Sequence, residues 1–249
     1  MNPILTATLA SLGAGLMTAL GALPALLLGG EVPDKLMDVL YGLSAGVMLA
    51  ASAFSLLVPA LGMGSVYHVA AGFVCGALLI EAGDRFIPHV HPVYGYEGPS
   101  SRLRKVWLLI LAMTIHNFPE GMAVGVAFAG ESFGAALALA IAIGIQNVPE
   151  GLAVSAPLVR EGYEGRRAVL YGTLTGLVEP LGGLVGAYAV ITVRTLLPFI
   201  MGLAAGAMIF VVSDEMIPES HRKGHERWAT MGVIAGFVIM MVLDNIFAY

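Results

Sequence analysis

The feature that most constrains this chain is a succession of eight apolar runs joined by short connections. A helix needs about 20 apolar residues to cross the ~30 Å hydrocarbon core of a bilayer. We expect membrane spans at 4–29, 36–61, 66–88, 104–129, 133–159, 166–190, 195–217 and 228–248. Only the segment from 88 to 102 is long enough to form a loop. The sequence therefore predicts an all-α, multi-pass membrane protein that forms a single domain over residues 1–249.

Composition agrees with a membrane location. Apolar residues make up 58% of the chain and charged residues 12%, whereas a soluble domain carries about 25% charged residues. The 32 glycines suit closely packed membrane helices. The single cysteine, Cys75, excludes an intrachain disulfide framework. The first residues, Met1 to Leu9, lack Lys and Arg, so they predict a retained span rather than a signal peptide.

The basic residues indicate the orientation. Eleven of the twelve fall at odd-numbered connections, and Arg194 alone falls on the other side. The eleven are Lys35, Arg85, Arg102, Arg104, Lys105, Arg160, Arg166, Arg167, Arg222, Lys223 and Arg227. Because cytoplasmic loops carry the excess of Lys and Arg, this bias places odd connections in the cytoplasm. We expect a plasma (inner) membrane protein with both termini outside the cytoplasm.

The chain repeats itself weakly at a long offset. Leu20–Leu23 resembles Leu181–Leu184, Gly42–Met48 resembles Gly202–Met208, and Ala71–Val74 resembles Ala235–Val238. Spans one to three thus match spans six to eight in order. An odd number of spans separates the copies, so the copies must have opposite orientations. Inverted repeats of this kind are typical of secondary transporters, and they predict a 3+2+3 arrangement.

Spans four and five form a stronger pair. Asn117–Val124 reads NFPEGMAV and Asn147–Val154 reads NVPEGLAV, with six of eight positions identical. Glu120 and Glu150 belong to this motif, and Glu179 lies in the sixth span. Counted at ~1.5 Å per helical residue from the nearest basic residue, all three carboxylates lie ~15 to 22 Å into the membrane. A charge at that depth costs at least ~2.5 kcal/mol, and no Lys or Arg occurs between Lys105 and Arg160. Protons or a bound metal must therefore balance these carboxylates.

The spacing of polar residues favours a metal. His116, Asn117 and Glu120 share one helix face, as do Gln146, Asn147 and Glu150. With Glu179 they offer imidazole, carboxylate and amide donors. This set suits a borderline divalent ion such as zinc, and also iron, manganese or cadmium. A proton pathway, or hydrogen bonding between helices, is the alternative interpretation of the same residues.

Prolines accompany the three carboxylates. Pro119, Pro149 and Pro180 each lack an N–H, which leaves one upstream backbone carbonyl free. Broken helical backbone in a membrane lies within protein or against a polar cavity. We therefore expect three helix breaks around one cavity.

A second polar group closes the third and seventh spans. Its members are Asp84, His89, His91, Asp214, Glu215, Glu219, His221, His225 and Glu226. They form either a solvated surface or a cytoplasmic relay that receives metal ions as they leave the membrane site.

At these motifs the chain resembles the ZIP (Zrt/Irt-like) family of divalent metal transporters, in particular its bacterial GufA-like branch. The resemblance rests on His116–Gly121, Gln146–Gly151, Glu179–Gly182 and Met48–Ser55, and it covers essentially the whole chain. It implies metal uptake into the cytoplasm, a homodimer and a binuclear site. One ion would be held by Met48, His116, Glu120, Gln146 and Glu150, and the other by Asn117, Glu120, Asn147, Glu150 and Glu179. By composition alone, Met48 would be assigned to packing.

Three departures from the family pattern concern the choice of metal. Many members carry a second histidine where Gln146 stands, and some relatives carry Asp where Asn147 stands. The long histidine-rich loop of the family is reduced here to His89 and His91. We therefore expect a weaker second ion, and a metal preference that is less strict than in zinc-specific members.

The function predicted is secondary transport of a divalent metal, zinc first, with the ion as substrate and no organic cofactor. The alternatives are an intramembrane metallo-enzyme and a proton-linked carrier of a small solute. The chain has no H-E-x-x-H motif and no Walker A motif, so we expect neither an enzyme nor an ATP-driven pump. The expected partners are metal ions, the lipid bilayer and a second copy of the chain, with no nucleic acid and no ATP.

For the mechanism, the resemblance implies an elevator-like motion. Spans one, four, five and six would move against a framework of two, three, seven and eight. The small-residue runs Gly42–Ser55 and Gly202–Met208 would give that framework a smooth wall for sliding.

Overall fold

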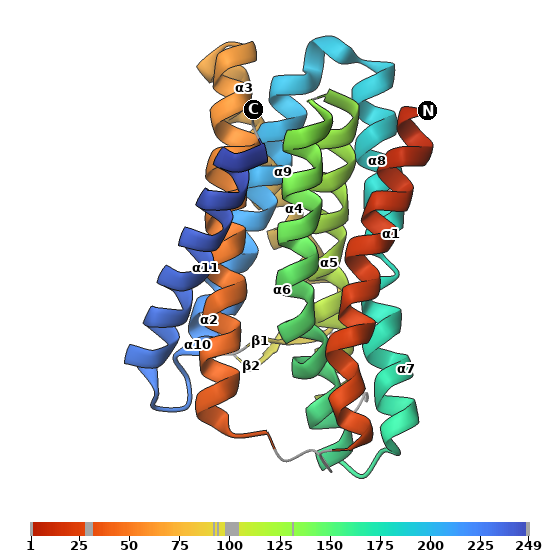
Figure 1. Ribbon diagram of the computed structural model, residues 1–249, viewed down its shortest axis with the longest axis vertical. Helices are drawn as coiled ribbons and strands as arrows, with labels where there is room; N and C mark the ends of the chain where they lie inside the picture. Colours follow the sequence, from red (N-terminus) through yellow and green to blue (C-terminus); the bar gives the residue numbers. More distant parts are fainter. Residues whose placement is uncertain are drawn as a thin grey trace.

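The computed structural model describes residues 2–27, 32–91, 93, 95–97, 105–130 and 132–247. Its long helices run side by side along one axis, and the two ends of the chain lie at the same end of the bundle (Figure 1). The elements are α1 (Pro3–Ala22), α2 (Asp34–Ala50), α3 (Val58–Met63), α4 (Val66–Phe86), β1 (His89–His91), β2 (Gly95–Glu97), α5 (Lys105–Gly130), α6 (Phe133–Arg160), α7 (Gly165–Gly176), α8 (Glu179–Thr192), α9 (Leu197–Val211), α10 (Ile217–Ser220) and α11 (Glu226–Phe247).

Seven helical stretches among the described residues are long and apolar enough to cross a membrane. They are Pro3–Leu26, Asp34–Met63, Val66–Gly83, Phe133–Arg160, Gly165–Thr192, Arg194–Ser220 and Glu226–Ile246. Each coincides with a predicted span to within a few residues. The remaining predicted span, 104–129, overlaps α5, some of whose first side chains lie outside the described set. The fold is thus that of a helical, multi-pass membrane protein.

Two local features differ from the prediction. The expected loop contains a two-stranded antiparallel hairpin, in which His89 pairs with Glu97 and His91 with Gly95. The predicted helix breaks at Pro119 and Pro149 are absent, because α5 and α6 run through both prolines. The helix is interrupted before Pro180, because α7 ends at Gly176 and α8 begins at Glu179.

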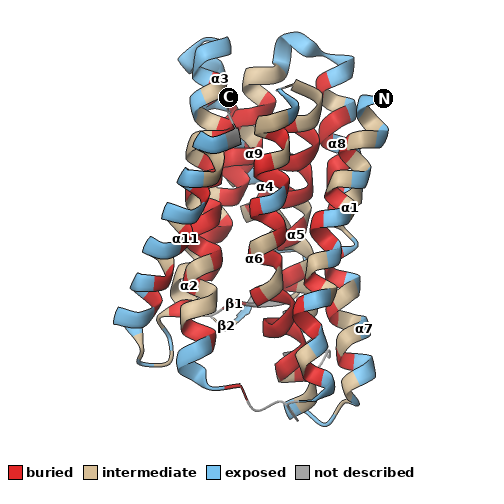
Figure 2. Cartoon of the chain, viewed as in Figure 1, coloured by how far each residue is buried: buried red, intermediate tan, exposed pale blue. Residues whose placement is uncertain are grey.

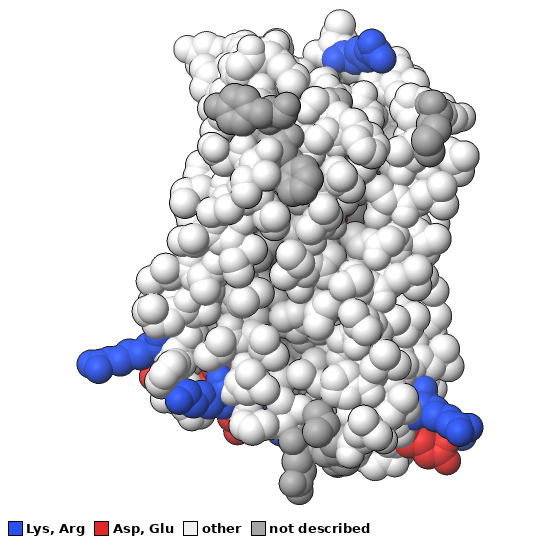
Figure 3. All heavy atoms as spheres, viewed as in Figure 1, with Lys and Arg blue, Asp and Glu red and all other residues white. Residues whose placement is uncertain are grey.

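Burial follows the helices toward the centre of the bundle. In the most apolar 18-residue stretch of α6, 78% of the residues are buried. In the corresponding stretches of α4 and α11, 22% are buried, and these helices lie at the outside of the bundle (Figure 2). The outer helices expose large apolar side chains such as Leu78, Val185 and Ile234. Lys and Arg gather at one end of the molecule, with a single group at the other end (Figure 3). An apolar band between charged ends fits a bilayer environment.

Glycines set the closest helix pairs. A Cβ at Gly42 or Gly46 of α2 would collide with the α11 backbone, and one at Gly232 or Gly236 of α11 would collide with α2. The same holds for α4 and α9. A Cβ at Gly72 or Gly76 of α4 would collide with the α9 backbone, and one at Gly202 or Gly206 of α9 would collide with the α4 backbone. These small-x-x-x-small pairs hold α2 to α11 and α4 to α9. The glycines of the runs Gly42–Ser55 and Gly202–Met208 are therefore covered by neighbouring helices and do not themselves form a sliding wall, while the role of the other small residues in these runs stays a prediction.

A different set of glycines holds α5 to α8 and α1 to α6. Gly121 lies against the Glu179 backbone, and Gly182 lies against that of Phe118. Gly151 lies against the Thr18 carbonyl, and Gly21 against Val148. The motif glycines Gly121 and Gly151 thus seat α8 and α1 directly beside the polar residues of α5 and α6.

Two π-helical segments follow helices α2 and α9. Ala51–Leu57 follows α2 and precedes Pro59, and Val212–Met216 follows α9 and precedes Pro218. Each proline removes the hydrogen bond to the carbonyl four residues earlier, and a wider turn accommodates the loss.

Candidate metal centre

The centre of the site is a buried cluster of His116, Glu120 and Glu150, with exposures of 1% or less. His116 and Glu120 are one turn apart on α5, and Glu150 faces them from α6. The His116 Nε2 atom lies 3.4 Å from Glu120 Oε1 and 3.7 Å from Glu150 Oε1. One donor atom from each residue falls within 4.8 Å of the other two. This separation allows one ion to contact all three side chains.

Gln146 lies one turn before Glu150, and its amide points toward the same cluster. Gln146 Nε2 donates a hydrogen bond to Glu120 Oε1. The backbone of Gln146 is in turn anchored from α2, because the Ser44 hydroxyl donates to the Gln146 carbonyl at 3.0 Å. The predicted face of α6 is therefore present, and α2 holds it in place.

Asn147 and Glu179 form a second compartment beside the first. Asn147 Nδ2 donates to Glu179 Oε1 at 2.6 Å and to the Ala14 carbonyl at 2.9 Å. Both protons of this amide are engaged, so the Asn147 oxygen is the atom left for a ligand. Glu179 is the first residue of α8, where the positive end of the helix dipole favours a carboxylate. The break before Pro180 therefore places this carboxylate at mid-bundle.

Many polar atoms in the two compartments have no hydrogen-bond partner among the described residues. They include both nitrogens of His116, both side-chain polar atoms of Asn117, both oxygens of Glu150, and one oxygen each of Thr18, Glu120, Gln146, Asn147 and Glu179. Buried polar atoms are satisfied in the great majority of cases. A cluster of unsatisfied nitrogen and oxygen atoms that includes oxygens of three carboxylates is chemically suited to a cation.

Met48 is fully buried on α2, one turn beyond Ser44. It belongs to the main hydrophobic core together with residues of α5, α6 and α9. Its position at the level of the site is compatible with packing and with ligation, and a ligand role for it stays a prediction.

The predicted cytoplasmic relay does not form one cluster among the described side chains. The side chains of Asp84 and His89 lie outside the described set. His225 Nδ1 lies 3.0 Å from Asp38 Oδ2, and His221 contacts Ser220, Ile217 and Thr230. His91 is separate from these two histidines. It lies next to Asp214, in the wall of a cavity at the same end of the bundle.

His91 has both ring nitrogens engaged. The Val93 backbone N–H donates to Nδ1 at 3.0 Å, and Nε2 lies 2.8 Å from the Asp214 carbonyl and 3.1 Å from its carboxylate. This pattern assigns the proton to Nε2. The Asp214 carbonyl is one that Pro218 cannot bond, so His91 satisfies it. To bind a metal, His91 would have to give up one of these partners.

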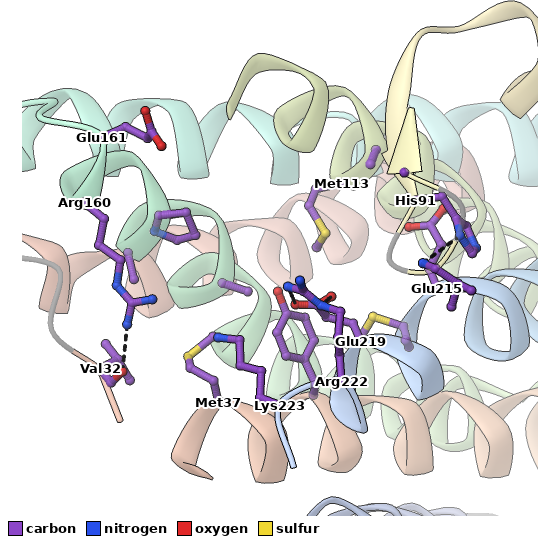
Figure 4. Close-up of a pocket in the computed structure, with 18 of the residues that line it drawn as sticks. Val32, Met37, His91, Met113, Arg160, Glu161, Glu215, Glu219, Arg222 and Lys223 are labelled. Carbon is purple, nitrogen blue, oxygen red and sulfur yellow. Dashed lines mark hydrogen bonds and ion pairs between the residues drawn. The ribbon is translucent and has the colours of Figure 1, made fainter. Parts of the chain in front are cut away.

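A cavity of about 640 Å³ opens at the end of the bundle that carries the hairpin (Figure 4). His91 and Glu215 lie on one side of it and Arg160 on the other, with Glu219 and Arg222 between them. Two hydrogen bonds of 2.8 Å join Arg222 to Glu219, and this carboxylate raises the pKa of the Arg222 guanidinium.

The inner wall of the cavity lies close to the deep site. Ala112 and Met113 line it from α5, four and three residues before His116. Ala153 lines it from α6, three residues after Glu150. The cavity therefore ends within about one helical turn, ~5.4 Å, of the His116 and Glu150 backbones. It extends from near the deep cluster toward the basic end of the molecule.

Comparison with known proteins bears on this geometry. A family model described as "ZIP Zinc transporter" matches residues 95–244. The chain is 48% identical to Zinc transporter ZIPB of Bordetella bronchiseptica over 245 residues, covering 92% of this chain and 77% of that protein. It is 43% identical to Zinc transporter GufA of Myxococcus xanthus, covering 94% and 96%. This chain belongs to the ZIP zinc transporter family. Human Zinc transporter ZIP11 is also similar, at 36% identity over 84% of this chain and 88% of that protein. The predicted membership and its GufA-like branch are confirmed.

Within this ZIP transporter, several residues around the site were not singled out from the sequence. Ser44 anchors Gln146, the Ala14 carbonyl holds Asn147, and Tyr41 lines the cavity. Ser44 could have been found, because it lies four residues before Met48 and so shares its helix face. The Ala14 carbonyl has no side-chain signal in the sequence.

Proposed function

We propose that this ZIP transporter carries divalent metal ions, zinc first, across the membrane into the cytoplasm. The observation that carries the proposal is the buried cluster of His116, Glu120 and Glu150, whose ligand atoms converge and mostly lack a hydrogen-bond partner among the described residues. One imidazole and two carboxylates are ligands that zinc accepts. The ion is the substrate, and catalysis is not part of the proposal.

The proposed architecture is a single domain of eight spans, with α5 as the fourth. Spans one to three and six to eight form inverted repeats in a 3+2+3 arrangement. The matched π-helical segments before Pro59 and Pro218 support this symmetry. So does the exchange of partners, since α2 of the first repeat packs on α11 of the second, and α9 of the second packs on α4 of the first.

The proposed orientation puts the cavity end in the cytoplasm and both termini outside, in the plasma (inner) membrane. The gathering of Lys and Arg at the cavity end supports it (Figure 3). In a Cys75→Ser background, Phe133→Cys should label from outside with an impermeant maleimide, and Glu164→Cys only from inside. Both positions are exposed. Phe133 is the first residue of α6, and Glu164 lies between the other end of α6 and the start of α7. Reversed labelling would contradict both the orientation and the direction of uptake.

The proposed site holds two ions. His116, Glu120, Gln146, Glu150 and Met48 would hold the first, and Asn117, Asn147 and Glu179 would share Glu120 and Glu150 around a second, weaker ion. The free oxygens of Asn147 and Glu179 support the second position. A homodimer is proposed from the family resemblance.

Alternating access would move α1, α5, α6, α7 and α8 against α2, α4, α9 and α11. The division is supported by packing, because glycine contacts join helices within each group. At the proposed cytoplasmic end, the relay would comprise Asp84, His89, His91, Asp214, Glu215, His221 and His225. To bind a metal, His91, His221 and His225 would each exchange a present partner for the ion.

The test is zinc uptake into liposomes containing the purified protein, with imposed pH and voltage gradients. We expect saturable uptake that Glu120→Gln and Glu150→Gln abolish. Glu81→Gln on the lipid-facing helix α4 is the matched control. Failure of the wild-type protein to take up zinc, manganese, iron or cadmium would contradict the proposal.

A further inference from the structure

Tyr41 is one of the cavity side chains that take no part in the ligand set described above. Tyr41 lies on α2, seven residues before Met48 and three before Ser44. This spacing puts Met37, Tyr41, Ser44 and Met48 in one stripe along the helix. Ser44 bonds the Gln146 carbonyl, and both Met37 and Tyr41 line the cavity. The stripe therefore extends from near the deep site toward the basic end.

The surroundings of Tyr41 differ at its two ends. Its ring packs among Leu152, Ala153 and Ala156 of α6 and against the main core. Its hydroxyl has no hydrogen bond assigned to it within the described part of the chain. Glu215 and Glu219 line the same cavity as Tyr41, and Ala153, in the apolar cluster that Tyr41 packs against, lies three residues after Glu150 of the deep site. Tyr41 is thus placed between the two groups of acids.

An ion that leaves the deep site must replace carboxylate oxygens by water. In the cavity wall nearest Glu150, the side chains of Ala112, Met113 and Ala153 offer no oxygen to that water. A phenol hydroxyl both donates and accepts hydrogen bonds, and it carries no charge that would trap the ion.

We propose that Tyr41 is a positioning residue for metal release, whose hydroxyl holds the water that replaces Glu150 as the ion enters the cavity. This inference rests on the proposed transport function. In this proposal the hydroxyl increases the rate of metal release, and the ring closes the inner end of the cavity. The equilibrium affinity of the deep site should depend on neither.

Tyr41→Phe tests the hydroxyl, because it keeps the ring that packs on α6. Protein loaded with zinc in detergent is mixed with a fluorescent zinc chelator, and the rate of zinc release is followed by stopped flow. We expect release to slow by about threefold to tenfold, with an unchanged zinc-induced rise in unfolding temperature. Tyr188→Phe, on the exposed face of α8, should release zinc at the wild-type rate.

A second variant guards against a folding defect. Tyr41→Gln restores a hydrogen-bonding group without the ring, and it should release zinc faster than Tyr41→Phe. Wild-type release by Tyr41→Phe would overturn the inference, as would a parallel loss of zinc affinity and of stability. If wild-type protein bound no zinc, the proposed function and this inference would both fail. If wild-type protein bound zinc and Tyr41→Phe released it at the wild-type rate, the inference alone would fail.

Discussion

The Asn147 side chain donates a 2.6 Å hydrogen bond to the Glu179 carboxylate, joining the middle of α6 to the first residue of α8. A neutral amide thus lies beside a buried carboxylate at the helix interruption between α7 and α8. Because the amide partly satisfies Glu179, this compartment needs less positive charge than one built from two carboxylates. The pairing gives a structural reason for the weak second ion expected from the sequence.

Replacing Asn147 by Asp tests that reason. Two carboxylates would then face each other in a dry environment, where like charges repel strongly. We expect the unfolding temperature of metal-free protein to fall by several degrees, and the rise on adding zinc to exceed that of wild type. Asn245→Asp, at an exposed position of α11, is the control and should change neither. A smaller zinc response in Asn147→Asp than in wild type would count against a second ion here.

The sequence was sufficient to find the polar cluster but not its supports. Spacing along one helix put His116 with Glu120 and Gln146 with Glu150, and the duplicated motif indicated that α5 and α6 are related. Glu179 could be assigned to the same group of polar residues. Its bond to Asn147 could not be predicted, because it depends on where α8 begins and on how α1 presents the Ala14 carbonyl.

The glycine runs show the opposite case, in which a pattern was recognised but its partner was not. A small-x-x-x-small spacing defines a helix face without saying which helix will cover it. Gly42 and Gly46 were assigned to a sliding surface, and in the structure they fit against α11. The histidines of the proposed cytoplasmic end were grouped by sequence position in a similar way, whereas the hairpin carries His91 to Asp214 and His225 pairs with Asp38.

Removal of the imidazole should abolish tight binding at the deep site. His116→Ala eliminates the one nitrogen donor of the cluster, while Glu120 and Glu150 remain as close acids. We expect zinc affinity, measured by competition with a chelator, to fall by at least about a hundredfold, or about 2.7 kcal/mol. His68→Ala, on the exposed face of α4, should leave it unchanged. An affinity within a few-fold of wild type would exclude His116 as a ligand.

A histidine in place of Gln146 should shift metal preference. Gln146 now contributes an amide that bonds Glu120, and an imidazole would add a second nitrogen donor and release that carboxylate. Because nitrogen ligands favour zinc over manganese, the zinc-to-manganese affinity ratio of Gln146→His should rise by about tenfold or more. The measurement is competition between the two ions in the same thermal-shift assay. An unchanged ratio would indicate that position 146 does not contact the ion.

A cross-link between the two helix groups should stop transport without destroying the site. Met37 of α2 and Ala156 of α6 belong to one apolar cluster and both line the cavity. In a Cys75→Ser background, Met37→Cys with Ala156→Cys should be joined by a short bifunctional thiol reagent. We expect zinc uptake to fall by at least about tenfold, because α6 can no longer move relative to α2, while zinc still raises the unfolding temperature. Reduction of a cleavable cross-linker should restore the rate.

The control for this experiment joins two helices of the same group. Phe54, after α2, and Phe237, on α11, have ring centroids 5.7 Å apart. Phe54→Cys with Phe237→Cys, cross-linked by the same reagent, should transport at the rate of its own uncrosslinked form, because both helices belong to the proposed framework. If both cross-links left uptake unchanged, α6 would not move against α2 during transport. Local opening and closing around a fixed site, at the level of the cavity, would then account for alternating access.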